Sequence, residues 1–211
     1  MVCAAMELLK QEVIGVIGPQ STAVSHFVAH MGAATQVPLL SFAATDPSLS
    51  EFQYPYFIRI AHSDAVQMQA IAALIGSYGW REVVALYTDD DFGSNGAAAL
   101  SDALEPVGSR LVQKTALVPG IDKTTITSIL NSLAAMQTRV FVVHMPQNLS
   151  LLLFSQAEYL GMMSSSYVWI MSDSTAGTLG SSNVDPGVLK SLQGVIGIRG
   201  YYAADSPQFQ T

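Results

Sequence analysis

The segment VIGVIGPQST at residues 13–22 contains a pattern that recurs along most of the chain. Its first half, residues 13–17, is a run of mainly apolar and β-branched residues, which favours a buried strand. The Gly-Pro pair that follows predicts a turn, and Ser21 could cap a helix running to about Ala34. This stretch therefore predicts one strand–turn–helix unit.

Similar units follow on the carboxyl side of this segment. Further strands are expected at residues 37–42, 56–60, 82–87, 110–117, 140–144, 167–171 and 194–200. Helices are expected at residues 64–78, 96–104, 124–133 and 149–160, with Asp64 as the cap of the first and Gln67 at its capping-box position. Apolar strands that alternate with helices predict an α/β fold in which parallel sheets are covered on both faces.

The composition narrows the classes of function. Half of the 211 residues are hydrophobic and 12% are charged, with a formal net charge of −7. A disordered chain is excluded, and the acidic balance argues against a nucleic-acid partner. Turn residues interrupt the uncharged run at residues 13–45 too often for a membrane span, and the first 13 residues resemble an amphipathic helix rather than a signal peptide. The remaining function is non-covalent binding of a small molecule or of another protein.

Five loops are expected at the carboxyl ends of strands, where parallel sheets bind their ligands. They lie at residues 18–22, 43–46, 88–93, 145–148 and 172–175. In the first loop, Ser21 either caps its helix or faces a bound anion, and both roles can hold together. A carboxylate suits this loop better than a polyphosphate, since it has neither a nearby Lys or Arg nor a phosphate-binding pattern.

The acidic and hydroxyl residues of the other loops have more than one interpretation. Thr45 could bond a carboxylate or an ammonium group, although a turn built with Asp46 is favoured. Residues 89–91 are three consecutive aspartates without EF-hand spacing, which favours a solvated loop over a cation site. Asp173 is a lone carboxylate that follows a strand.

Motifs for catalysis and for metal binding are missing from the sequence. His26 and His30 have the spacing of a helical metal pair, but no glutamate beside them completes a zinc-protease motif, so a packing role is favoured. A nucleophile elbow, a Walker loop and a Cys–His pair are also missing, so we expect neither an enzyme nor a cofactor. The single cysteine, Cys3, is either a small apolar helix residue or the partner of a cysteine outside this chain. Asn148 begins a glycosylation sequon.

Seven stretches of the chain carry a family resemblance. In order they are VIGVIGPQS (13–21), VPLLSFAATDP (37–47), QYPYFIR (53–59), YGWREV (78–83), DDDFGSNG (89–96), RVFVVH (139–144) and YVWI (167–170). Together they resemble the amino-terminal domain of plant glutamate receptor-like channels, over essentially the whole chain.

The resemblance implies a particular fold. It is the two-lobed, type I periplasmic-binding-protein-like fold, a three-layer αβα arrangement with mainly parallel sheets, incomplete here at both ends. Residues 1–80 would form part of lobe 1, residues 81–199 would form lobe 2, and residues 200–211 would begin the crossover back to lobe 1.

The resemblance also implies a ligand site. Ser21 and Thr22 would face a ligand carboxylate, Phe92 would stack on the ligand, and Thr45, Asp64 and Asp173 would face its ammonium group. Metabotropic relatives have a serine in place of Ala43 and a tyrosine in place of Phe92. Each hydrogen bond lost in this way is expected to weaken binding about tenfold or more. Asp64 has an equally good explanation as a helix cap.

The implied function is an extracellular sensing or assembly domain of a glutamate receptor-like, ligand-gated cation channel. Its ligand would be an amino acid or a small peptide, and it would attach to a membrane only through segments downstream of this chain. One alternative is a ligand-free module that forms homo- or hetero-oligomers through lobe 1, with Phe27/Met31 or Met68/Ile71 as candidate faces. Another alternative is a soluble, periplasmic-type amino-acid-binding protein.

Overall fold

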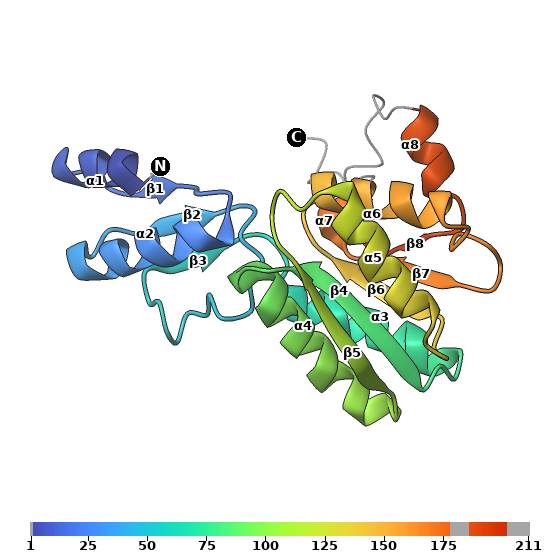
Figure 1. The fold of residues 1–211 in the computed structure, drawn as a ribbon. Helices are drawn as coiled ribbons and strands as arrows, with labels where there is room; N and C mark the ends of the chain where they lie inside the picture. Colours follow the sequence, from blue (N-terminus) through green and yellow to red (C-terminus); the bar gives the residue numbers. More distant parts are fainter. Residues whose placement is uncertain (1, 178–185, 202–211) are drawn as a thin grey trace, which may run out of the picture.

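The computed structural model describes residues 2–177 and 186–201, which form two parallel sheets with helices packed against them (Figure 1). The first sheet and its helices comprise α1 (Val2–Lys10), β1 (Val16–Ile17), α2 (Thr22–Thr35), β2 (Leu39–Ser41) and β3 (Phe57–Arg59). We call this unit lobe 1. The predicted α/β class with mainly parallel sheets is confirmed, because every strand pair in both sheets is parallel.

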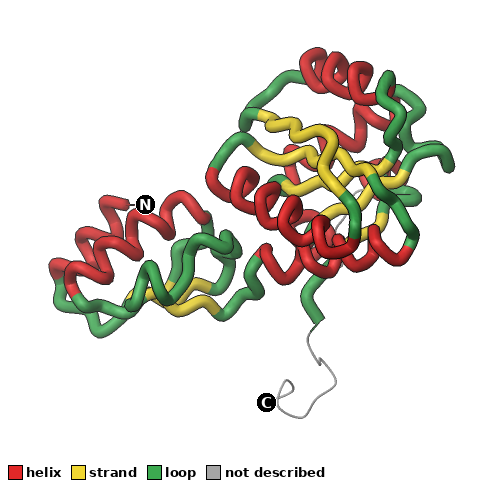
Figure 2. Tube along the Cα trace, turned by 90° about the horizontal axis from the view of Figure 1, so that it is seen from below, coloured by secondary structure: helices red, strands yellow, loops and turns green. Residues whose placement is uncertain are grey.

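The sheet of lobe 1 has the order β1-β2-β3 and two unlike faces. The register places Val16, Leu39 and Phe57 in one row, and these side chains pack with the buried residues of α1 and α2. The next row along the strands points to the opposite face, because side chains alternate along a strand. It contains Ile17 and Ile58, which are 78% and 53% exposed. Figure 2 shows both helices on one side of these strands.

Lobe 2 is larger and has three complete layers. It comprises α3 (Asp64–Ser77), β4 (Glu82–Thr88), α4 (Asp91–Leu104), the 3-10 helix η1 (Glu105–Val107), β5 (Arg110–Leu117), α5 (Lys123–Ala134), β6 (Val140–His144), α6 (Gln147–Tyr159), β7 (Val168–Met171), α7 (Asp173–Ala176), α8 (Pro186–Ser191) and β8 (Ile196–Gly197). Its sheet has the order β5-β4-β6-β7-β8.

Both faces of the lobe 2 sheet are buried. Alternate residues of β4, β6 and β7 pack on α3 and α4, among them Val83, Val142 and Ile170. The intervening residues, such as Leu86 and Trp169, pack on α5 and α6. This explains why the strands are apolar almost throughout, as expected for a parallel sheet covered by helices on each side.

Helix α3 belongs to a different lobe from the one expected. Residues 1–80 were expected in lobe 1, yet Met68, Ile71 and Ile75 are fully buried against the sheet of lobe 2. The change of lobe therefore falls between β3 and α3. Met68 and Ile71 are core residues and are not available as an assembly face. Most of the expected crossover, residues 202–211, lies outside the described residues.

Several element boundaries also differ from the expected ones. Helix α3 is capped by Ser63, whose hydroxyl accepts from the N–H of Ala65, so Asp64 is its first residue and not its cap. Helix α4 begins at Asp91 rather than at residue 96, because the Asp90 carboxylate caps it through the N–H of Gly93. The strand expected at residues 194–200 is reduced to β8. Across the described ranges, no helix is long and apolar enough to cross a bilayer.

Candidate functional site

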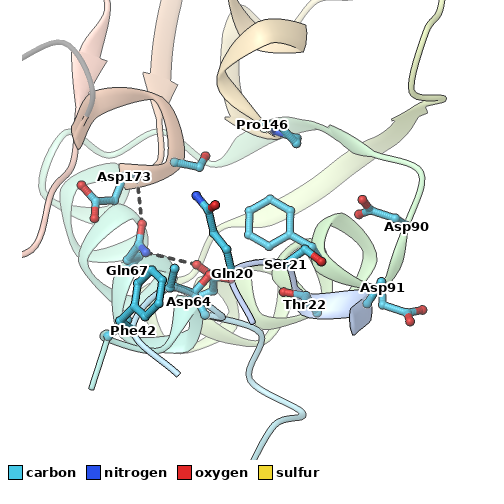
Figure 3. A pocket seen from close by; sticks show the side chains of 16 residues that line it. Gln20, Ser21, Thr22, Phe42, Asp64, Gln67, Asp90, Asp91, Pro146 and Asp173 are labelled. Carbon is cyan, nitrogen blue, oxygen red and sulfur yellow. Dashed lines mark hydrogen bonds between the residues drawn. The ribbon is translucent and has the colours of Figure 1, made fainter. Parts of the chain in front are cut away.

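A pocket of about 470 Å³ lies where the carboxyl ends of the strands in the two lobes meet (Figure 3). This volume is within the range of small-molecule sites. All five of the expected strand-end loops contribute to its lining, through residues 20–22, 43 and 45, 90–92, 146, and 173–174. The remaining lining residues come from the first turn of α2, the residue that follows β2, the loop after β3 and the first turn of α3.

The structure brings all six sequence-predicted site residues to this one pocket. They are Ser21, Thr22 and Thr45 from lobe 1, and Asp64, Phe92 and Asp173 from lobe 2. Their roles as ligand contacts remain predictions. The environments of the six side chains differ, and these differences determine what each can do.

The amino end of α2 opens onto the pocket. Ser21 is its N-cap residue, but the Ser21 side chain makes no capping hydrogen bond. The first helical bond runs from the N–H of Ser25 to the carbonyl of Ser21, so the three preceding N–H groups have no partner within the helix. Thr22 is 6% exposed, and its hydroxyl has no hydrogen-bond partner among the described residues. Unpaired N–H and hydroxyl donors at a helix start suit a carboxylate.

Thr45 and Asp64 are bonded to each other. The Thr45 hydroxyl donates to Asp64 Oδ2 at 2.8 Å, and the backbone N–H of Asp64 donates to the carbonyl of Thr45 at 2.8 Å. The Gln67 amide donates to Asp64 Oδ1 at 3.1 Å. Burial raises the pKa of Asp64 to about 7, although the bond from Thr45 opposes the shift. Near neutral pH this carboxyl is therefore only partly ionised.

Asp173 contributes to the pocket in a different way than expected. Its backbone N–H donates to Gln67 Oε1 at 2.9 Å, which links α7 to α3. Figure 3 shows its carboxylate directed away from the pocket. Burial raises the pKa of this carboxyl, and the nearby charges of Arg199 and His62 partly oppose that shift.

Phe92 packs on a buried histidine beneath the pocket. The rings of Phe92 and His144 are tilted, with centroids 4.2 Å apart. His144 Nδ1 is hydrogen-bonded to Ser172 Oγ at 2.9 Å, and Nε2 lies 3.7 Å from Asp64 Oδ2. Burial lowers the pKa of His144 to about 4, so the ring is neutral at physiological pH. A Cβ at Gly96 would lie 2.3 Å from this ring, and the glycine is required for its position.

Comparison with known proteins assigns the family. Residues 2–211 match the model of the receptor family ligand binding region, known as ANF_receptor. The chain belongs to this family. The receptor region is 42% identical over 207 residues to glutamate receptor 3.4 of Arabidopsis thaliana, covering 98% of this chain and 22% of that relative.

Other relatives give the same result. Glutamate receptor 3.7 of Arabidopsis thaliana is 42% identical over 195 residues, which is 92% of this chain and 21% of the relative. Glutamate receptor 3.1 of Oryza sativa subsp. japonica is 37% identical over 196 residues, again 92% and 21%. The receptor region thus spans about a fifth of the length of these relatives. The predicted resemblance is confirmed, and the chain is a receptor-type region and not an enzyme.

Sequence reasoning missed several lining residues of the receptor region. Gln20 lies in an expected loop without a predicted role, Asp90 was expected in a solvated loop, and Phe42 was expected as the last residue of a strand. Phe42 instead follows β2 and is 56% exposed. Gln67 was assigned to a capping box, and it bridges Asp64 and Asp173. The only sign of this bridge in the sequence was the spacing, which places the Gln67 amide one helical turn after Asp64.

A polar cluster joins the two lobes of the receptor region beside the pocket. Asp46 is fully buried, and it accepts from Asn95 Nδ2 of α4 at 3.1 and 3.0 Å. His26 Nε2 lies 3.1 Å from Asp46 Oδ2, and the N–H of Ser48 donates to Oδ1 at 2.8 Å. His26 and His30 both contact the Tyr54 hydroxyl. No three His, Cys, Asp or Glu side chains are positioned to hold a metal ion in the parts of the chain that the structure describes.

Proposed function

We propose that the receptor region is the extracellular sensing domain of a glutamate receptor-like, ligand-gated cation channel, and that it binds an amino-acid-type ligand in the interlobe pocket. The observation that carries this proposal is the open start of α2, where the Thr22 hydroxyl and N–H groups without a partner in the helix lie at a pocket that Asp64 and Asp90 also line. Donors and carboxylates on the same pocket suit a zwitterion. The names of the relatives support a receptor role.

The mechanism would be closure of the lobes. A bound ligand would contact the start of α2 in lobe 1 and the starts of α4 and α7 in lobe 2. It can make both sets of contacts only when the lobes are close together. Such a ligand shifts the population toward the closed state by its differential affinity for that state. The change in lobe angle would then bias an attached channel.

Calorimetry with a panel of amino acids and small peptides tests the site. The Thr22→Val variant removes the hydroxyl and keeps the side-chain shape, and a hydrogen bond to a charged group contributes about 1.5–3 kcal/mol. We therefore expect binding about tenfold or more weaker. Thr124→Val, at an exposed threonine in the first turn of α5, is the matched control and should bind as the wild type does. If no heat and no thermal shift appear with any compound, the sensing role is rejected.

A second role in assembly is supported by Phe27. This residue lies on α2 in lobe 1, and its side chain is 65% exposed. We propose that it contributes to pairing of receptor subunits. Asn148, exposed in the first turn of α6, is the proposed glycosylation site that accompanies an extracellular location. Sedimentation of the Phe27→Ser variant tests the pairing, and an unchanged oligomeric state would exclude this face.

A further inference from the structure

We infer that the pocket selects its ligand by charge, that it prefers an amino acid with a cationic side chain, and that Asp90 sets this preference. The inference rests on the proposed function, because it names the class of ligand for the same pocket. It begins from the charges of the lining. Four aspartates line the pocket, and among the described residues that line it none is a Lys, an Arg or a His.

The four carboxylates are not equally available. Asp64 already accepts from Thr45 and Gln67. In Figure 3 the carboxylates of Asp91 and Asp173 are directed away from the pocket, whereas the Asp90 carboxylate is directed into it. Asp90 is exposed, and only its Oδ1 has a described bond, from the N–H of Gly93 at 2.9 Å. An ionised carboxylate accepts about four hydrogen bonds, so Asp90 retains capacity for a ligand cation.

The same charges act against an acidic ligand. The start of α2 can accommodate one carboxylate, but a second carboxylate on the ligand side chain would find no lining cation. Free energy is lost when an ionised group gives up its water shell and gains no partner of opposite charge. A ligand with a cationic side chain is favoured instead, since the field of the pocket carboxylates attracts the side-chain cation. The exposed Phe42 ring and Pro146 offer apolar surface for the methylenes of such a side chain.

Two pairs of ligands that differ mainly in the charge of the side chain measure this selection by calorimetry. Lysine and norleucine differ in the terminal ammonium, and glutamate and glutamine differ in the side-chain charge. We expect lysine to bind about tenfold more tightly than norleucine, and glutamate to bind at least tenfold more weakly than glutamine. The lysine preference should decrease as sodium chloride is added, because salt screens charges at an open site.

The Asp90→Asn variant tests the assignment to one residue. Asparagine is as good an N-cap as aspartate, so α4 should stay capped, and circular dichroism checks this. The ratio of the lysine affinity to the norleucine affinity should fall from about ten to near one, while the norleucine affinity itself stays unchanged. Asp122→Asn is the matched control, because Asp122 caps α5 through the N–H of Thr125 and does not line the pocket.

The outcomes separate the two proposals. If none of the four compounds binds, the proposed function fails. If all four bind with equal affinity, the amino-acid site stands and the charge selection is overturned. If Asp90→Asn weakens lysine and norleucine by the same factor, Asp90 holds the α-ammonium group, and the side-chain preference is not due to it.

Discussion

Asp64 lines the pocket with His144 3.7 Å away, and burial shifts their pKa values in opposite directions. The carboxyl takes up a proton more readily when folded, whereas the imidazole loses its proton more readily. Both groups are therefore mainly neutral in the folded chain at slightly acid pH. Their charge states, and with them the stability of the lobe 2 core, depend on pH over the range in which most proteins are studied.

The Asp64→Asn variant isolates the carboxyl. The folded pKa of Asp64, about 7, is above its ordinary value of 3.8, so its contribution to stability is full below pH 3.8 and is lost as the pH rises through 7. Asparagine is neutral throughout. The free energy of unfolding of the variant should therefore rise relative to wild type between pH 4.5 and 7.5, by up to about 1.4 kcal/mol per pH unit.

Urea denaturation at several pH values makes this measurement. His144 has the opposite dependence, since its pKa falls from 6.5 to about 4 and its contribution is lost as the pH falls through that window. It is present in both proteins and cancels from their difference. Parallel stability curves for wild type and variant would contradict the raised pKa of Asp64.

The site could be predicted at the level of loops but not of side-chain orientation. The pattern of apolar runs and turns predicts which loops follow strands, and the family resemblance predicts that Ser21, Phe92 and Asp173 in those loops contact one ligand. The surroundings of Asp173 come from distant parts of the chain, because its N–H donates to Gln67, 106 residues away, and its carboxylate lies near Arg199. The Asp90 carboxylate, which is directed into the pocket, could not be distinguished from those of Asp89 and Asp91, because the three residues are identical in type.

At the scale of elements, the open face of the lobe 1 sheet has a direct consequence. Ile17 and Ile58 project from this face. Exposed apolar surface on a sheet promotes association between chains. Because this face carries isoleucines and the opposite face packs on helices, the lobe 1 strands are apolar on both sides and do not alternate between apolar and polar residues.

Ile58→Thr should reduce this association at little cost. Threonine is β-branched and fits a strand, so the free energy of unfolding should change by no more than about 0.5 kcal/mol. Light scattering of the purified chain should show less aggregate. Phe57→Ala, on the buried face of the same strand, is the contrasting variant and should cost about 3–5 kcal/mol. Equal aggregation of Ile58→Thr and wild type would exclude this face as the cause.

Helices and strands of lobe 2 were predicted well because their patterns are long. The strand expected at residues 110–117 coincides with β5. The lobe to which α3 belongs could not be predicted, since the apolar stripe of Met68 and Ile71 does not specify which sheet it covers. The start of α4 was missed because Gly93 and Gly96 lower helix propensity in its first turns.

At the scale of the whole molecule, the bonds from Asn95 to Asp46 join the lobes through side chains. Asn95→Ala should leave the buried Asp46 carboxylate with fewer donors, at a cost of about 1–3 kcal/mol. It should also widen the range of lobe angles, which small-angle X-ray scattering would register as a larger radius of gyration. Asn131→Ala, at an exposed position on α5, should change neither quantity. An unchanged scattering profile for Asn95→Ala would show that this cluster does not restrain the lobes.

The bonds between Thr45 and Asp64 hold the start of α3 against lobe 1, and this contact can serve as a pivot between the lobes. Thr45 holds the first residue of α3 by two bonds, while the rest of this 14-residue helix lies within lobe 2. At 1.5 Å per residue the helix is roughly 21 Å long. If lobe 2 rotates about Asp64, α3 turns with the core into which it packs, so the residues at the far end of the helix move farthest.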